Sequence, residues 1–246
     1  LMAAAATGFA WRVRSERVSN RRGGGEDVRV AEPPVAPPVQ SVERIVYSKQ
    51  DGAGDDYDIF SAAPDGTDVV NLTEDIAWDA AVPRISPDGV HIAFRDRAMS
   101  ETWVMRSDGS EKRKVLAGDY RRVVEDWMGP THLLYRNSLD VGRAQLRTVR
   151  IDGTEDQILI DTPWHGQSTC FGGVKISPDG YKMAGAWQIG AWSPTFDIYL
   201  SDANGENGRV FYGDANDDHQ DLNPIWSPAG QTIYRVHFIK AAYDTA

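Results

Sequence analysis

Short apolar runs rich in Val, Ile, Tyr and Phe alternate with turns rich in Gly, Pro and Asp along most of the chain. This pattern is typical of half-buried β-strands, and no stretch shows an amphipathic helix of useful length. We therefore predict an all-β protein with strands that include 44–48, 58–62, 69–72, 92–95, 103–106, 133–135, 146–150, 157–160, 197–201 and 233–236.

A four-residue turn recurs between these strands. Ser-Pro-Asp-Gly stands at 86–89 and 177–180, Ser-Pro-Ala-Gly at 227–230, and a degenerate copy, Trp-Met-Gly-Pro, at 127–130. Proline fixes its own φ, aspartate bonds nearby backbone and glycine accepts a positive φ, so the motif specifies a tight turn. Gly180 follows Gly89 by 91 residues, and Gly230 follows Gly180 by 50. These distances indicate a structural repeat of about 45 residues.

A second marker has the same period. Asp-Gly or Asn-Gly pairs begin at Asp65, Asp108, Asp152 and Asn204, with spacings of 43, 44 and 52 residues. Such pairs between apolar runs are strong hairpin signals. A repeat of 40–50 residues with strand patterning predicts the four-stranded blades of a β-propeller. With strands a to d in each blade, the chain reads bcd, abcd, abcd, abcd, ab, which is 17 strands.

These markers resemble the TolB-type propeller family, a relative of the WD-repeat propellers. The resemblance covers residues 42–240. It rests on 86–89 followed by Ile92-Ala93-Phe94, on 58–60 with 65–67 and 72–73, and on 197–199 with Asp202. The sequence departs from the family pattern at Ala229 and at 128–130. The resemblance implies the repeat type and leaves the function open, because such blades serve many roles.

The strand count does not close a ring in the usual way. A propeller closes when the two ends of the chain complete one blade together. Here the first blade lacks only strand a, whereas the end of the chain supplies both a and b, which is one strand too many. We expect about four and a half blades of a six- to eight-bladed ring, in a chain that is a fragment. The alternative is a five-bladed ring with a spare strand, which would leave an open sheet edge.

Composition and charge exclude several classes of protein. The chain has 246 residues with a net charge of −10, and 41% of them are hydrophobic, as in ordinary globular proteins. The acidic character argues against nucleic-acid binding, which needs a basic face. The single cysteine, Cys170, excludes an internal disulfide framework and any multi-cysteine metal site, and we expect it to be a packing residue.

The segment before the repeats differs from them. Residues 1–40 hold six Arg and four acidic residues, a net +2, whereas the remaining residues hold 20 basic and 32 acidic residues, a net −12. We interpret residues 1–16, with an apolar start, as a candidate truncated membrane anchor or signal remnant. Residues 17–41, with Gly23–Gly25 and paired prolines, are expected to be a flexible linker, and 42–246 the propeller. A signal segment would place the propeller outside the cytoplasm, whereas arginines after an anchor would favour the cytoplasmic side by the positive-inside rule. Between these alternatives we expect a periplasmic or other extracytoplasmic location, with a membrane tether.

Candidate binding residues lie in the loops between blades and in the b–c loops, which alternate strand direction places on one face. Loops on a rigid scaffold commonly carry binding sites. Exposed aromatic, His, Gln and Asp side chains suit a protein partner or a small polar ligand such as a sugar or peptide. The candidates are Trp78, Asp79, Trp164, His165, Gln167, Trp192, Asp218, His219 and Gln220. In the alternative interpretation, Trp78 and Trp164 pack between blades and the aspartates bond strand a.

Enzymatic hypotheses remain as alternatives to a non-enzymatic binding module. His165 with Gln167 and His219 with Gln220 loosely resemble the metal-binding residues of oligogalacturonate lyases, which are TolB-like propellers. The same repeats occur in the propeller gate of prolyl-oligopeptidase-like peptidases, which need a separate hydrolase domain. We expect no catalytic residue, metal or cofactor here, because neither a Gly-x-Ser-x-Gly elbow nor a phosphate loop is present.

Overall fold

The computed structural model describes residues 12–17, 43–50, 56–140, 143–161, 171–188, 196–212 and 219–239. The regular elements in these ranges are 18 β-strands in five antiparallel sheets, called blades 1 to 5 in chain order. Every strand range predicted above is confirmed, with ends that differ by a few residues. Among the residues that the structure describes, we find no helix with the length and apolar character needed to cross a bilayer.

Each blade follows the order predicted from the two turn markers. Blade 1 contains β2 (Ile45–Gln50), β3 (Tyr57–Ala62) and β4 (Val70–Asn71). Blade 2 contains β5 (Ala80–Ile85), β6 (His91–Asp96), β7 (Thr102–Arg106) and β8 (Arg113–Leu116). Blade 3 contains β9 (Arg122–Met128), β10 (His132–Asp140), β11 (Arg143–Arg150) and β12 (Gln157–Asp161). Blade 4 contains β13 (Phe171–Ile176), β14 (Lys182–Gln188), β15 (Phe196–Asp202) and β16 (Arg209–Tyr212). Blade 5 contains β17 (His219–Trp226), β18 (Thr232–Ile239) and β1 (Arg12–Arg17).

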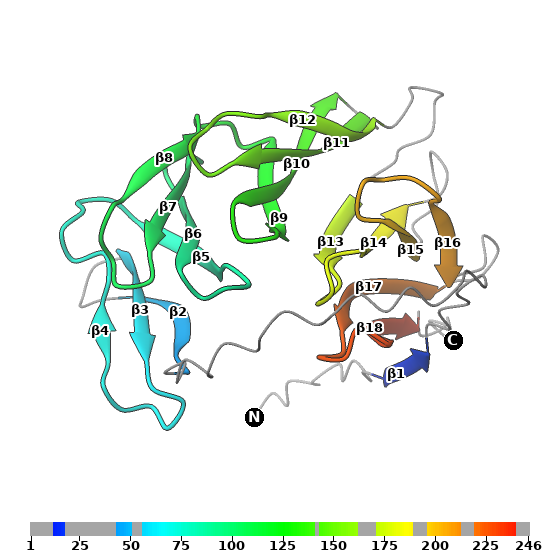
Figure 1. The fold of residues 1–246 in the computed structure, drawn as a ribbon, viewed down its shortest axis with the longest axis horizontal. Coiled ribbons are helices and arrows are strands. Elements are labelled where there is room, and N and C mark those ends of the chain that lie inside the picture. Colours follow the sequence, from blue (N-terminus) through cyan, green and yellow to red (C-terminus); the bar gives the residue numbers. More distant parts are fainter. Residues whose placement is uncertain are drawn as a thin grey trace, which may run out of the picture.

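The blades follow one another in an arc, with β5, β9, β13 and β17 on its inner side and β4, β8, β12 and β16 on its outer side (Figure 1). Inner strands of neighbouring blades contact each other. Within the described ranges, no strand of blade 1 pairs with a strand of blade 5, so the sheets do not close into a ring. The predicted partial propeller is therefore confirmed.

Blade 5 contains a strand that the sequence pattern did not predict. Residues 12–17 form β1, which pairs antiparallel with β18 from Arg12 opposite His237 to Arg17 opposite Thr232. These residues fall in the segments that we expected to precede the propeller. Their partner lies about 220 residues later in the sequence, and so no local pattern points to the pairing. The candidate anchor and linker otherwise lie outside the described residues.

The Ser-Pro-Asp-Gly turn closes itself with side-chain hydrogen bonds. In blade 2 the Ser86 hydroxyl accepts the main-chain N–H of His91 at 2.9 Å and donates to the Asp88 carboxylate. Asp88 also accepts the N–H of Val90 at 3.1 Å, and Gly89 has a φ of 72°, which favours glycine. Residues 177–182 of blade 4 repeat every one of these bonds.

The a–b and c–d turns share one face of the propeller. In blades 2, 3 and 4 the first residue of the c–d turn donates a main-chain hydrogen bond, 2.9 Å long, to the a–b turn: Ser107 to Val90, Ile151 to Thr131, and Ala203 to Tyr181. The loops at the other strand ends must therefore lie on the opposite face, as predicted.

Apolar packing fills the spaces between blades. Successive residues of β6 point to opposite sides, as strand geometry requires. Ile92 and Phe94 join Ile59 of blade 1 in one buried cluster, whereas Ala93 joins Leu133 of blade 3 in another. Blade 2 thus buries both of its faces, one against blade 1 and the other against blade 3.

Hydrogen bonds also join the inner strands of neighbouring blades. The indole N–H of Trp127 on β9 donates to the carbonyl oxygen of Arg84 on β5, and that of Trp226 on β17 donates to Lys175 on β13. Between these pairs, the N–H of Ile176 donates to the Asp126 carboxylate at 3.0 Å. The inner strands of blades 2 to 5 are therefore bonded in sequence.

Candidate ligand-binding face

The loop face of blade 2 consists of residues 72–79, 97–101 and 117–121, which connect strands at the end opposite the Ser-Pro-Asp-Gly turns. Main-chain bonds hold these loops together. The N–H of Arg97 donates to the carbonyl oxygen of Asp79 at 3.0 Å, which joins the 97–101 loop to the 72–79 loop. The N–H of Ser138 on β10 donates to the carbonyl oxygen of Arg121 at 2.9 Å, which joins the 117–121 loop to blade 3.

Trp78 lies at the boundary between blades 1 and 2. Its ring centre is 6.0 Å from that of Phe94, with the planes 12° apart, and 5.2 Å from that of Trp103. It is half-buried and packs against the cluster that contains Ile59 and Met105. This geometry supports the packing role, while ligand contact by Trp78 stays a prediction.

Asp79 connects blade 1 to the loop face. Its carboxylate accepts the main-chain N–H of Tyr57 at 3.0 Å and lies 3.6 Å from the guanidinium of Arg97. That guanidinium also lies over the Tyr57 ring, 4.4 Å from its centre. The three side chains form a closed network that fixes the 97–101 loop.

The 117–121 loop presents an exposed aromatic side chain. Tyr120 is 73% exposed, and Met99 on the adjacent loop is 67% exposed. The main chain below them is fixed, because the Asp119 carboxylate accepts the N–H of Arg121 at 2.9 Å. Gly118 allows close approach of the two loops, since a Cβ at this position would lie 2.1 Å from the carbonyl oxygen of Met99. Tyr120 is thus an exposed side chain on a constrained loop.

Most of the predicted binding residues lie outside the described residues. These are Trp164, His165, Gln167, Trp192 and Asp218. His219 and Gln220 begin β17, on the inner side of the arc, but their side chains are also outside the description. The structure therefore brings together only Trp78 and Asp79 of the predicted set. Across the described ranges, no group of three or more His, Cys, Asp or Glu residues could hold a metal ion.

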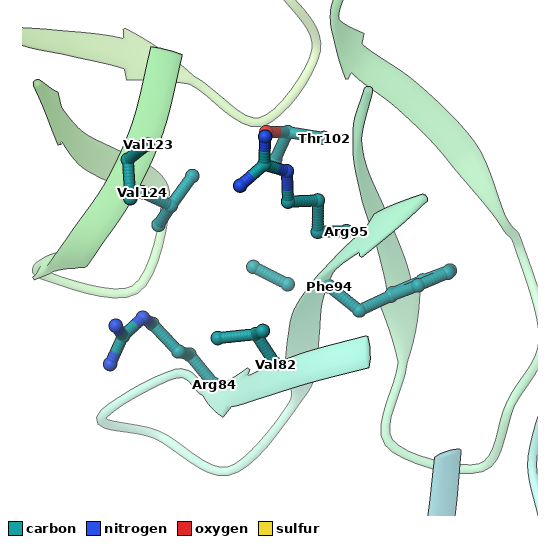
Figure 2. A pocket seen from close by; sticks show the side chains of 8 residues that line it. Val82, Arg84, Phe94, Arg95, Thr102, Val123 and Val124 are labelled. Carbon is teal, nitrogen blue, oxygen red and sulfur yellow. The ribbon is translucent and has the colours of Figure 1, made fainter. Parts of the chain in front are cut away.

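A cavity of about 90 Å³ lies between blades 2 and 3, next to the ends of the strands that carry the loop face. It is lined by Val82, Arg84, Ala93, Phe94, Arg95, Thr102, Val123 and Val124. Arg95 and Thr102 are paired residues directly before and after the 97–101 loop. In Figure 2 the Arg95 guanidinium lies beside Thr102, and the Arg84 guanidinium lies at the lower left, below Val124.

Sequence reasoning passed over these arginines. Arg84 and Arg95 stand on β5 and β6, whereas every binding residue predicted above was assigned to a loop. A signal was present, because both are charged residues inside apolar strand patterns. That they share a cavity depends on the register shift between Ala81 and Arg84, which the pattern did not indicate.

Solved structures share this arrangement of blades. A TolB-type protein from Agrobacterium tumefaciens superposes with a TM-score of 0.61 at 18% identity, covering 80% of this chain and 71% of that one. The fold is that of a TolB-type β-propeller. An oligogalacturonate lyase from Vibrio parahaemolyticus follows at 0.59 and 14% identity, covering 79% of this chain and 56% of the lyase.

More distant propellers extend the range of functions. A prolyl endopeptidase matches with a TM-score of 0.52 at 18% identity, covering 72% of this chain and 28% of the peptidase. No model of a protein family matches the sequence, and no curated protein does either. Similarity at 14–18% identity shows the fold alone, because the same propeller supports binding, lyase and peptidase functions.

Proposed function

We propose that this protein is a non-enzymatic binding module that presents its loop face to a protein or to a small polar ligand such as a sugar or peptide. The observation that carries the proposal is the exposed pair Tyr120 and Met99 on loops whose main chain is hydrogen-bonded and sterically constrained. Tyrosine supplies a large amphipathic contact surface, and a fixed loop loses little entropy on binding.

Charge near this pair favours a polar or acidic partner. The Arg97 side chain is 48% exposed and lies on the adjoining loop, and Arg121 follows Tyr120 directly. Arginine and tyrosine are enriched among residues that dominate binding energy. The net −10 of the whole chain would repel acidic partners elsewhere on the surface and so favour approach to this region.

The apolar start and the Gly- and Pro-rich segment of the sequence support a tethered, extracytoplasmic module. The resemblance to TolB-type propellers also supports an extracytoplasmic location, because propellers of that family serve in assemblies of envelope proteins. The location is tested by fusing the full reading frame to a reporter that is active only outside the cytoplasm. An inactive reporter would contradict the extracytoplasmic location.

The loop face is tested with a matched pair of tyrosines. Tyr120 on this face and Tyr181 on the Ser-Pro-Asp-Gly face are 73% and 74% exposed. The purified chain is screened against immobilised oligosaccharides and peptides, and the dissociation constant of each bound ligand is measured. We expect Tyr120→Ala, and the double variant Trp164→Ala/His165→Ala, to weaken binding at least tenfold, with Tyr181→Ala unchanged. Weakening by Tyr181→Ala alone would assign binding to the opposite face.

Two enzymatic functions are second candidates, each on a specific observation. The structural likeness to an oligogalacturonate lyase, with His165, Gln167, His219 and Gln220 in the sequence, favours a metal-dependent polysaccharide lyase. Bound Mn, Ca or Zn in the purified protein, together with product from uronate oligomers, would establish it. The likeness to a prolyl endopeptidase favours a peptidase gate, which requires a hydrolase domain in the full reading frame.

A further inference from the structure

Three arginines near the boundary between blades 2 and 3 are half-buried and have no side-chain partner. The Nε atoms of Arg84, Arg95 and Arg122 are inaccessible to solvent and have no hydrogen-bond partner. Among the described residues, none of these three guanidinium groups forms an ion pair or a hydrogen bond. A guanidinium that is partly shielded from water and has no counter-charge loses hydration without compensation, and a bound anion would supply that compensation.

Nearby carboxylates are engaged elsewhere. Glu125 on β9 bonds Arg136 at 3.2 Å, and Asp126 accepts the N–H of Ile176 and lies 3.8 Å from Lys175. Asp96, at the end of β6, accepts the N–H groups of Ala98 and Met99. None of them neutralises Arg84 or Arg95.

The positive charge of Arg84 affects the pKa of Lys175. The pKa of Lys175 is lowered, chiefly by burial, although the adjacent Asp126 acts in the opposite direction. Arg84 adds to this lowering through repulsion between like charges, whereas Glu125 opposes it.

The cavity restricts what can neutralise this charge. Its volume of about 90 Å³ exceeds the roughly 10–15 Å³ that one water molecule needs on the same measure. It can therefore hold a small anionic head group. Guanidinium forks match the two oxygens of a carboxylate. The Val82, Val123 and Val124 side chains favour a group with an apolar stem over a strongly hydrated phosphate dianion.

We propose that the cavity between blades 2 and 3 is a carboxylate-binding site in which Arg84 and Arg95 grip the anionic head group between apolar walls. The carboxylate belongs either to a free short-chain acid or to the end of a peptide. This site is distinct from the loop face. It involves neither Tyr120 nor any loop outside the described residues.

The indole N–H of Trp127 is a built-in reporter, because it donates to the carbonyl oxygen of Arg84. Its ¹⁵N–¹H resonance is assigned by its loss in Trp127→Phe. Acetate is titrated into the full chain at constant ionic strength, with chloride as the replaced anion. We expect a saturable shift of the Trp127 resonance and none at Trp226, which bonds Lys175 instead. A shift that does not saturate, or an equal shift at Trp226, would overturn the proposal.

Variants locate the site. We expect Arg84→Gln and Arg95→Gln each to raise the acetate dissociation constant about tenfold, since each removes charge-assisted hydrogen bonds. Arg95→Lys keeps the charge without the fork and should give an intermediate constant. Arg106→Gln, on the exposed end of β7, is the matched control and should leave the constant unchanged. An unchanged constant in both glutamine variants would refute the site.

Ligand series identify the source of the carboxylate. Acetate and propionate are compared with N-acetyl-dialanine as the free acid and as the amide. Tighter binding of the dipeptide acid than of acetate assigns the site to a peptide end, and the reverse assigns it to a small acid. Binding of the amide, or inorganic phosphate binding more tightly than acetate, would contradict the proposed chemistry. Tyr120→Ala should leave every constant unchanged, which separates this test from that of the loop face.

Discussion

The indole nitrogen of Trp127 and the carbonyl oxygen of Arg84 lie 2.8 Å apart across the boundary between blades 2 and 3, although 43 residues separate them in the sequence. Trp226 repeats the arrangement with Lys175 between blades 4 and 5. A bond from one inner strand to the next does not belong to any sheet, so it holds the blades in register with one another.

Replacing Trp127 with phenylalanine should therefore weaken the interface between these blades. The variant keeps an aromatic ring but leaves the Arg84 carbonyl unpaired, and we expect a loss of about 1–3 kcal/mol in the free energy of unfolding. Urea denaturation measures it. Trp103→Phe is the control, because its indole bonds Glu101 within the same blade at a partly exposed position, and it should cost less than about 1 kcal/mol. Equal losses for both variants would show that the bond between blades contributes no more to stability than a bond within one blade.

Ala229 offers a stabilising substitution. It stands where the other two intact turns have Asp88 and Asp179, whose carboxylates accept hydrogen bonds from the turn. Ser227 already accepts the N–H of Thr232 at 3.1 Å, so the rest of the turn is formed. We expect Ala229→Asp to raise the free energy of unfolding by about 0.5–1 kcal/mol, and Asp179→Ala to lower it by a similar amount. Thermal and urea unfolding of both variants give the comparison, and a destabilised Ala229→Asp would contradict it.

Tyr135 makes stability depend on alkaline pH. Burial, reinforced by the hydrogen bond to Asp156, raises the pKa of Tyr135 from 10.0 to about 12. The folded protein therefore holds this proton more tightly than the unfolded chain. The resulting stabilisation is fully present below pH 10 and is lost as the pH rises through 12. Tyr135→Phe lacks this dependence, so its stability relative to wild type should improve from pH 9 to pH 12. Parallel profiles in urea denaturation would disprove the assignment.

Gly118 should not tolerate a side chain. A Cβ there would meet the Met99 carbonyl at 2.1 Å, so the 117–121 loop must move away from the 97–101 loop. We expect Gly118→Ala to lower the free energy of unfolding by roughly 1–3 kcal/mol, as overpacking does. The same substitution should weaken the binding of any ligand to the loop face. Gly172→Ala is the control, because its Cβ would meet nothing within 4 Å and its φ is not positive. A Gly118→Ala variant as stable as Gly172→Ala would contradict the close approach.

The sequence predicts the blades well because their determinants are local. Ser86, Asp88 and Gly89 form their turn with bonds that reach five residues at most. The degenerate turn at 127–130 still reverses the chain, with Met128 paired to His132 and Gly129 at a φ of 69°. Repeats of such turns set the strand order, and the predicted order of 17 strands is the observed one.

The site is harder to predict because its determinants are not local. The sequence left Trp78 with two interpretations, ligand contact or packing between blades, and its contacts with Phe94 and Trp103 follow from how two blades pack. Arg84 and Arg95 become notable only through the absence of a partner, which depends on where every nearby carboxylate is engaged. Tyr120 was visible in the sequence, but its exposure is set by Gly118 and Asp119.

The pairing of β1 with β18 also determines when β1 can join its sheet during synthesis. During synthesis, blades 2 to 4 can each form from consecutive strands as they emerge, whereas β1 must wait until Ile239 has been made. Until then, residues 12–17 have no partner strand in blade 5. Once docked, β1 covers the edge of β18, an edge that would otherwise be available to strands of other chains.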